Sequence, residues 1–301
     1  MKAGWLAIGV LGLGVMLGAA AWNASAAANP WLVIRVQASV LIFGFGLLLL
    51  VLGSIEWLRS RHFEQRLNFL RKESEEERRR FLRRLDHELK NPLTSILAGL
   101  ANLDSDESEE DRQSTRRSIQ SQVQRMRDLL ADLRKLAELE TRPIESGRVD
   151  LAEILRESRE MVLEKPGAGD RRIDLTVPHA PWPLPLVSGD RDLLFLAVHN
   201  LVENAVKFTE AGARIELRAY EDGSNAIIEV ADTGPGIPDE ERALIWEELY
   251  RGRAASGLPG SGLGLALVRS IAEKHGGKVL VRSRPGQGTV FSLTIPIDSV
   301  I

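Results

Sequence analysis

The sequence of 301 residues contains no cysteine, which excludes disulfide-stabilised folds, thiol nucleophiles and cysteine-rich zinc sites. Its formal net charge is −3 at pH 7. Domains that bind nucleic acid through their charge are usually clearly basic, so we expect no nucleic-acid partner. Charge is also scarce before Glu56, where Lys2 and Arg35 alone are charged, although Asp, Glu, Lys and Arg make up 27% of the chain. The chain therefore divides into an apolar N-terminal part and a highly charged remainder.

Two uncharged apolar stretches, 3–22 and 36–55, lie in this N-terminal part. About 20 helical residues at about 1.5 Å each are long enough to cross the hydrocarbon core of a bilayer. Tryptophans lie at the four ends of the stretches, where membrane proteins collect aromatic side chains: Trp5, Trp22, Trp31 and Trp57. We therefore predict a transmembrane hairpin over residues 1–57.

The first stretch has a second interpretation. Lys2 precedes it and the small residues Ala24-Ser25-Ala26 follow, as in a secretory signal peptide, although the apolar run is longer than such signals usually have. Basic residues flank the second stretch and place its C-terminal side in the cytoplasm by the positive-inside rule: Arg59, Arg61, Arg66, Arg71 and Lys72. The bulk of the chain is cytoplasmic in either case.

The apolar spacing after the anchor predicts helices. Residues 58–80 form either a connecting helix with a weak coiled-coil seam or a solvated charged helix. Residues 81–142 then predict an antiparallel hairpin, interrupted by the acidic stretch 104–111. Each helix carries one apolar stripe: Leu82, Leu85, Leu89, Leu93, Ile96 and Leu100, then Ile119, Val123, Met126, Leu130, Leu133 and Ala137. One stripe per helix is buried when two hairpins pair, so we predict a four-helix bundle in a homodimer.

Residues 148–298 have the pattern of an α/β domain. Segments 172–177, 215–220, 227–230 and 288–296 read as strands, and 193–208 and 265–275 as helices. The first of these helices carries Asn200, Glu203, Asn204 and Lys207 on one face, although asparagine is a poor helix former. Three glycine-containing segments follow, and glycines that lead into a helix suit phosphate binding. Their glycines include Gly234, Gly236, Gly260, Gly262 and Gly264, with Thr289 in the last segment.

On the first hairpin helix, His87 lies off the apolar stripe, and Asn91 lies on the same exposed face. The segment His87-Glu88-Leu89-Lys90-Asn91-Pro92-Leu93 resembles the phosphoacceptor motif of bacterial membrane sensor histidine kinases. The segments 200–208, 232–236 and 260–265 resemble, in order, the asparagine box and the glycine boxes of the same family. The resemblance covers residues 60–298.

This resemblance implies a C-terminal α/β (α+β) sandwich ATPase domain of the gyrase, Hsp90 and histidine-kinase type. It implies that Asp232, with Thr289 nearby, binds adenine, and that Asn200 and Asn204 hold Mg²⁺ bridged to the phosphates of ATP. Lys207 would pair with a phosphate, and the loop 245–260 would be the lid over ATP. His87 would attack the γ-phosphate with help from Glu88, and Asn91 would position water for dephosphorylation of the partner. The sequence 245–251 departs from the aromatic lid motif, so the resemblance assigns no role to Arg251.

We therefore expect a multi-pass sensor histidine kinase of the bacterial inner (cytoplasmic) membrane. Since no receiver domain follows Ile301, its phosphoryl acceptor should be an aspartate of a separate response regulator. Segment 23–35 is too short to fold alone, so the stimulus should enter through the membrane helices or a partner membrane protein. The main alternative is a non-catalytic or phosphatase-dominant ATP-binding transmitter. A free or serine-directed ATPase of the same superfamily is disfavoured by the hairpin and its histidine.

Overall fold

The computed structural model describes residues 13–21, 32–103, 108–141, 143–165, 169–179 and 181–297, with the backbone alone at 32–40, 62–71, 73, 74, 77 and 140. The chain separates into two compact units, Met1–Arg80 and Phe81–Ile301. Helix α2 (Leu32–Leu103) contributes residues to both.

In the first unit, the segment Leu41–Arg61 of α2 has the length and apolar composition of a membrane-spanning helix. Its large side chains lie exposed, among them Leu41, Phe45 and Leu47. Residues 36–40 of the expected span belong to the same helix, which begins at Leu32. Of the first expected span, residues 13–21 are helical, and the rest lies outside the described residues, as do the alternative signal-peptide site and most of the loop 23–35.

The second unit begins with a helical hairpin, as the sequence predicted. The last part of α2 is followed by α3 (Glu109–Thr141), and α2 continues through Pro92. Where α3 begins, the Ser108 hydroxyl accepts a hydrogen bond from the Asp111 N–H (3.2 Å). A serine at this position satisfies an otherwise unpaired N–H, which explains why α3 begins at Glu109, within the acidic stretch 104–111.

The apolar residues of the hairpin form two sets. Leu129, Leu136 and Leu139 of α3 are buried in the core of the α/β domain, and Leu85 and Leu89 of α2 pack against that core. The predicted stripe residues Val123 and Leu130 are exposed, as are Leu82, Leu93, Leu97 and Leu100. Part of the predicted stripes thus packs within the chain, and the rest leaves apolar surface that a second molecule could cover.

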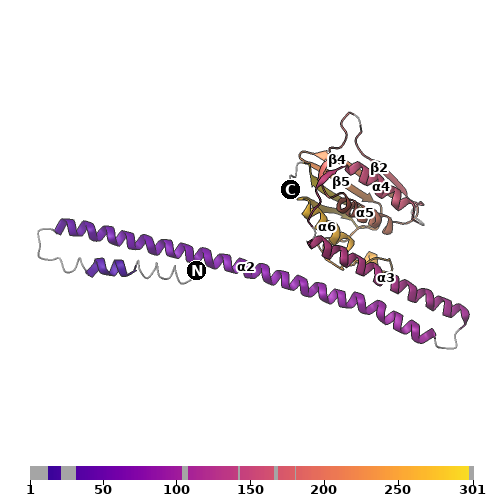
Figure 1. Cartoon of the computed structure of the whole chain (residues 1–301), viewed down its shortest axis with the longest axis horizontal. Helices are drawn as coiled ribbons and strands as arrows, with labels where there is room; N and C mark the ends of the chain where they lie inside the picture. The colour runs from indigo at the N-terminus through magenta and orange to yellow at the C-terminus, as the bar shows by residue number, and fades with distance from the viewer. Residues whose placement is uncertain are drawn as a thin grey trace. The chain divides into compact units, whose positions relative to one another are not determined.

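The α/β domain is a five-stranded mixed sheet packed against helices (Figure 1). The strand order is β2-β4-β5-β7-β6, in which β2 and β4 are parallel and the other pairs antiparallel. The strands are β2 (Arg172–Thr176), β4 (Arg214–Asp222), β5 (Asn225–Asp232), β6 (Lys278–Arg284) and β7 (Gly288–Pro296). A second small sheet pairs β1 (Gly147–Val149) with β3 (Val187–Gly189). Sequence analysis did not identify β1, β3 or β6, which are short or less regularly apolar.

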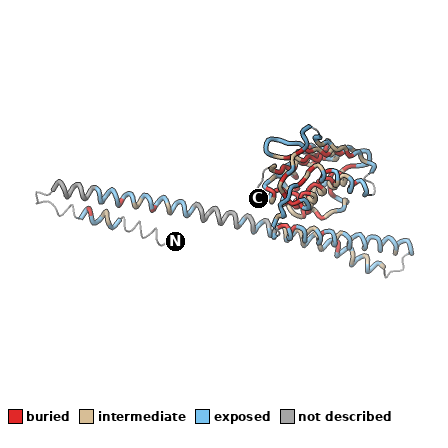
Figure 2. The backbone as a smooth tube through the Cα atoms, turned by 45° about the horizontal axis from the view of Figure 1, so that its top comes forward, coloured by how far each residue is buried: buried red, intermediate tan, exposed pale blue. Residues whose placement is uncertain are grey.

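Three helices contact the sheet: α4 (Leu151–Leu163), α5 (Arg191–Lys207) and α6 (Gly264–Lys274). The strand residues that pack toward them alternate along each strand, such as Ile215 and Leu217 of β4 and Ile228 and Val230 of β5, all fully buried. Figure 2 shows the buried residues concentrated in this domain, whereas exposed residues predominate along the hairpin. The domain therefore has a core of its own.

Two buried residues fix the position of α5. The Asp190 carboxylate accepts hydrogen bonds from the N–H groups of Asp192 and Leu193 (3.1 Å each), which caps the helix. The Asp190 N–H donates to Nε2 of the fully buried His275 (3.0 Å), whose Nδ1 donates to the Ile271 carbonyl (2.7 Å). Since His275 follows α6, this chain of bonds ties the start of α5 to the end of α6.

Candidate functional site

The polar face of α5 meets the start of α6. The Asn200 side-chain nitrogen donates a hydrogen bond to the Leu196 carbonyl (2.8 Å). The side-chain oxygen of Asn200 is left free to accept a hydrogen bond or to bind a cation. That oxygen lies 2.8 Å from the position a Cβ would take on Gly264, so a larger residue there would collide with it. Leu263, the residue that precedes α6, makes no side-chain cap, and the first N–H groups of a helix attract anions. Asn200 and the start of α6 thus face the same small region.

Positive charge converges beside this region. The Lys207 ammonium lies 2.5 Å from the position of a Cβ on Gly260 and 5.1 Å from the centre of the Phe208 ring. Burial, followed by the positive charges of Arg251 and Arg125, lowers the pKa of Lys207 to about 8. Burial and the charge of Arg125 also lower the pKa of Arg251, against the opposing effect of Glu88. We call Lys207, Arg251 and Arg125 the cationic group; such a group favours a multiply charged anion.

A second polar region lies where β5 ends. The Asp232 carboxylate accepts a hydrogen bond from the Gly234 N–H (2.8 Å) and pairs in register with Thr289 of β7. Burial raises the pKa of Asp232, although the backbone N–H groups of Gly234 and Thr289 oppose this. The Thr289 and Ser283 hydroxyls are 2.9 Å apart, and Ser283 also accepts from the Ile237 N–H (2.8 Å).

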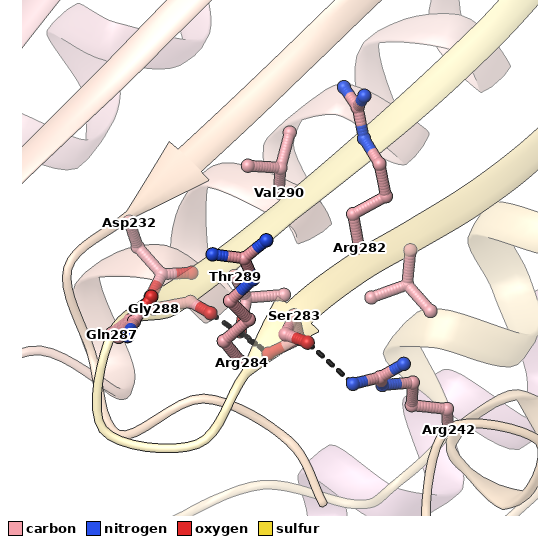
Figure 3. Close-up of a pocket in the computed structure, with 10 residues that line it drawn as sticks. Asp232, Arg242, Arg282, Ser283, Arg284, Gln287, Gly288, Thr289 and Val290 are labelled. Carbon is pink, nitrogen blue, oxygen red and sulfur yellow. Dashed lines mark hydrogen bonds between the residues drawn. The ribbon is translucent and has the colours of Figure 1, made fainter. Parts of the chain in front are cut away.

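Asp232 and Thr289 line a cavity of about 470 Å³ (Figure 3). Its other walls come from β6 and the turn before β7, and Arg242 donates to the Ser283 carbonyl (2.6 Å) at its edge. A partly buried carboxylate with hydroxyls close by can accept a hydrogen bond from an amino group and hold it in one orientation.

The glycines of segments 232–236 and 260–265 let other parts of the backbone pack closely against these segments. Gly236 has φ +71°, and a Cβ there would lie 2.2 Å from the Arg284 carbonyl oxygen. Gly262 has φ +76°, and its Cβ would lie 2.9 Å from the Tyr250 carbonyl oxygen. A Cβ on Gly234 would lie 2.7 Å from the Phe208 carbonyl oxygen. The segments around Asp232 and before α6 can therefore pack only with glycine at these positions.

The segment 244–260 contains two short 3₁₀ helices, Leu244–Trp246 and Arg253–Ala255. Between them Leu249 is buried at φ +60°, an unfavourable conformation for a bulky residue that marks a constrained loop. The Arg251 guanidinium donates to the Ala255 carbonyl (2.7 Å) and the Leu258 carbonyl (2.5 Å). Arg251, to which the sequence assigned no role, therefore both braces this segment and belongs to the cationic group.

The hairpin presents His87 and Asn91 as exposed side chains, whereas Glu88 is partly buried. The Glu88 carboxylate accepts a hydrogen bond from Arg125 of α3 (2.8 Å). Nearby, Arg84 donates to the Glu247 carboxylate (2.5 Å) and the Glu248 carbonyl (3.2 Å), and Ser261 donates to Asp132 of α3 (2.6 Å). These contacts join the hairpin to both ends of the segment 244–261. Sequence analysis missed Arg84, Arg125 and Asp132, because nothing in their spacing indicates contacts so distant in the chain.

The residues also fit a magnesium ion. No group of three or more His, Cys, Asp or Glu side chains suited to a metal occurs among the described residues. The free Asn200 oxygen is instead the kind of neutral oxygen ligand that Mg²⁺ takes when phosphates and waters supply most of its coordination. Asn204 lies one turn further along α5 and is half-buried; Glu203 is paired with Lys165. Asn200 is thus available to an ion that arrives with phosphates.

Two known families match the chain. Residues 77–142 match the His Kinase A (phospho-acceptor) domain, and residues 189–299 match the histidine kinase-, DNA gyrase B- and HSP90-like ATPase. The signal transduction histidine-protein kinase/phosphatase MprB of Mycobacterium sp. (strain KMS) is 35% identical over 259 residues, or 82% of this chain. The chain belongs to the bacterial sensor histidine kinases. This confirms the family, the helical hairpin and the ATPase-type α/β domain that the sequence predicted.

Other proteins are similar to the chain as well. The adaptive-response sensory kinase SasA of Thermosynechococcus vestitus is 35% identical over 71% of this chain and 59% of its own length. The crystal structure of full-length ShkA in complex with AMPPNP matches 70% of this chain and 44% of its own, with 30% identity and a TM-score of 0.52. The chain covers 49% of the length of MprB. It therefore spans about half the length of the curated relatives that it matches.

Proposed function

We propose that the chain transfers the γ-phosphoryl group of ATP to His87 and then to an aspartate of a separate response regulator. The observation that carries this proposal is the position of Glu88, the residue after His87. It lies close enough to the segment 244–261 for its charge to act on Arg251 in the cationic group. The phosphoacceptor helix and the candidate phosphate region are therefore neighbours in one compact unit.

ATP fits the two polar regions. The Asp232 carboxylate accepts a hydrogen bond from the adenine amino group, with Thr289 beside it, and Lys207 with the N–H groups at the start of α6 binds the phosphates. Asn200 and Asn204 would supply oxygen ligands to a Mg²⁺ ion that arrives with ATP, and the ion would neutralise part of the phosphate charge. ShkA, solved in complex with AMPPNP, supports a nucleotide of this kind.

The transfer is an in-line displacement. A neutral His87 nitrogen forms an N–P bond to the γ-phosphorus, while the bond from that phosphorus to the bridging oxygen breaks and ADP leaves with the electron pair. The other ring nitrogen then releases its proton to the Glu88 carboxylate. The positive charges of Lys207 and Arg251 stabilise the spread negative charge, so that catalysis consists mainly of positioning and electrostatics.

A homodimer is proposed on the exposed apolar residues of the hairpin, since a second hairpin would cover them in a four-helix bundle. The apolar segment Leu41–Arg61 supports an anchor in the bacterial inner membrane, and a second span before it would make the protein multi-pass. The basic residues after the anchor place the kinase domains in the cytoplasm. The stimulus would enter through the membrane helices or a partner membrane protein. Grafting residues 1–57 onto another kinase should then transfer the stimulus, and failure to transfer it would contradict this route.

The full chain in detergent or nanodiscs, incubated with Mg²⁺ and γ-labelled ATP, should acquire acid-labile, base-stable phosphate. His87→Gln should abolish the label, whereas His179→Gln, which changes an exposed loop histidine, should not. Asn91→Ala should keep the label but slow dephosphorylation of the regulator. A wild-type chain that binds ADP but never becomes labelled would instead support the non-catalytic transmitter.

A further inference from the structure

The ion pair between Glu88 and Arg125 crosses the hairpin from α2 to α3. Its atoms are 2.8 Å apart, and the side chains are 20% and 35% exposed, so that water only partly screens it. Glu88 is the residue after the phosphoacceptor His87, and the pair therefore sets the position of one of the two carboxylates that flank this histidine in the chain. The proposed transfer requires that carboxylate to take a proton from His87.

Arg125 also has a second set of neighbours. Its charge acts on Lys207 at the end of α5 and on Arg251 in the segment 244–260, and it lowers the pKa of both. The charge of Glu88 acts on Arg251 as well, with the opposite sign. The charge of Arg125 thus acts on one carboxylate and on two other cations, and Arg251, on which Glu88 also acts, would compete for that carboxylate if Arg125 were absent.

We propose that Arg125 is a positioning residue for phosphoryl transfer: it holds the Glu88 carboxylate beside His87 and away from Arg251. This inference rests on the proposed kinase activity. Without Arg125, Glu88 would pair with Arg251, and two losses would follow. His87 would lose its proton acceptor, and the γ-phosphate would lose part of the charge that stabilises it.

An ordinary structural ion pair would behave differently. If Arg125 only stabilised the hairpin, its removal would lower the melting temperature and leave kcat of the folded protein unchanged. If Arg125 acts through Glu88, its removal costs activity only while that carboxylate is present. The kinetic coupling between the two residues therefore separates the two roles.

The test measures kcat for autophosphorylation, KM for ATP and the affinity for ADP in the full-length chain. The variants are Arg125→Ala, Glu88→Gln, the double variant, and Arg127→Ala as a control at an exposed arginine of the same helix. Arg125→Ala should lower kcat by about tenfold to a hundredfold, the size expected when a reacting group is misplaced. Because Arg125 also belongs to the cationic group, KM and ADP affinity of Arg125→Ala should change as well, but by less than kcat, whereas all constants of Arg127→Ala should stay within about twofold of wild type.

Adding Arg125→Ala to Glu88→Gln should lower kcat no further than Glu88→Gln alone. Additive losses, or an Arg125→Ala chain as active as Arg127→Ala, would overturn the inference while leaving the kinase activity in place. A wild-type chain without phosphohistidine would overturn both. If Arg125→Ala no longer bound ADP and had lost its fold, Arg125→Gln, which keeps the length of the side chain, would take its place under the same criteria.

Discussion

The hairpin and the α/β domain bury their apolar residues in different ways. Leu201, Ile228 and Leu293 of the α/β domain are fully buried within it, whereas Leu97 and Leu130 of the hairpin are 59% and 56% exposed. The α/β domain therefore has a closed core, to which Leu129, Leu136 and Leu139 of α3 contribute, and the rest of the hairpin leaves apolar surface for another molecule to cover. This difference suits a kinase in which the hairpin dimerises and presents the histidine while the ATPase domain binds nucleotide alone.

The largest effect should follow from a cavity in the complete core. Leu201→Ala should destabilise the α/β domain by about 2–5 kcal/mol, the usual cost of such a truncation at a fully buried site. Thermal or urea unfolding of the full chain, followed by loss of ADP binding, would measure it. Leu97→Ala, the matched leucine on the exposed side of the hairpin, should change this transition by less than about 0.5 kcal/mol. Equal effects would contradict the comparison.

The next effect concerns nucleotide binding by the α/β domain. Asp232→Asn replaces an acceptor with a group that also presents a donor, so ADP affinity should fall by roughly a hundredfold or more. Analytical ultracentrifugation should find the dimer unchanged, because Asp232 belongs to the α/β domain. Loss of the dimer in this variant would mean that nucleotide binding by the α/β domain and dimerisation by the hairpin depend on each other.

The exposed side of the hairpin gives the third prediction. Leu97→Glu should weaken dimerisation by about tenfold or more, since an unpaired charge would be buried in the bundle. ADP binding should stay as in wild type. A dimer of undiminished affinity, measured by dilution in detergent, would show that another surface forms it.

The smallest effect is a pH dependence at the cationic group. Lys207 has a pKa of about 8, lowered by burial and by Arg251 and Arg125, and its charged form binds phosphate. As pH rises from 7.5 to 9 the charged fraction falls, so ADP affinity should fall by roughly fivefold to tenfold. Isothermal titration calorimetry in two buffers should also detect proton uptake on binding. Lys207→Gln should bind ADP weakly with a flat profile; a steep profile in that variant would assign the titration to another group.

Much of this organisation could be predicted from the sequence, because it depends on local pattern. The helix spacing predicted the hairpin, the alternation at 215–220 predicted β4, and the short apolar run at 227–230 predicted β5. The spacing could not decide which partner each apolar residue packs on: Leu130 and Leu129 are adjacent, yet one is exposed and the other buried in the α/β core. Helix periodicity fixes a face but not the neighbour that covers it.

The residues of the candidate site also fall into those that local pattern identifies and those that it does not. His87, Asn200 and Asp232 were identified because they belong to motifs with a characteristic local order. Arg125 and Arg251 were not, since their significance lies in contacts with Glu88 and Lys207 that only the folded chain brings about. Charge interactions between distant segments leave no periodic signal in one sequence, and a structure is needed to find them.

The central claim is that ATP held at Asp232 and Lys207 phosphorylates His87 of the hairpin. Mass spectrometry of peptides from the full chain, prepared at alkaline pH after incubation with Mg²⁺ and ATP, tests it most directly. We predict one phosphoryl group on the peptide that contains His87, absent from His87→Gln and from Asp232→Asn. A phosphoryl group on another residue, or undiminished phosphorylation in Asp232→Asn, would contradict the account.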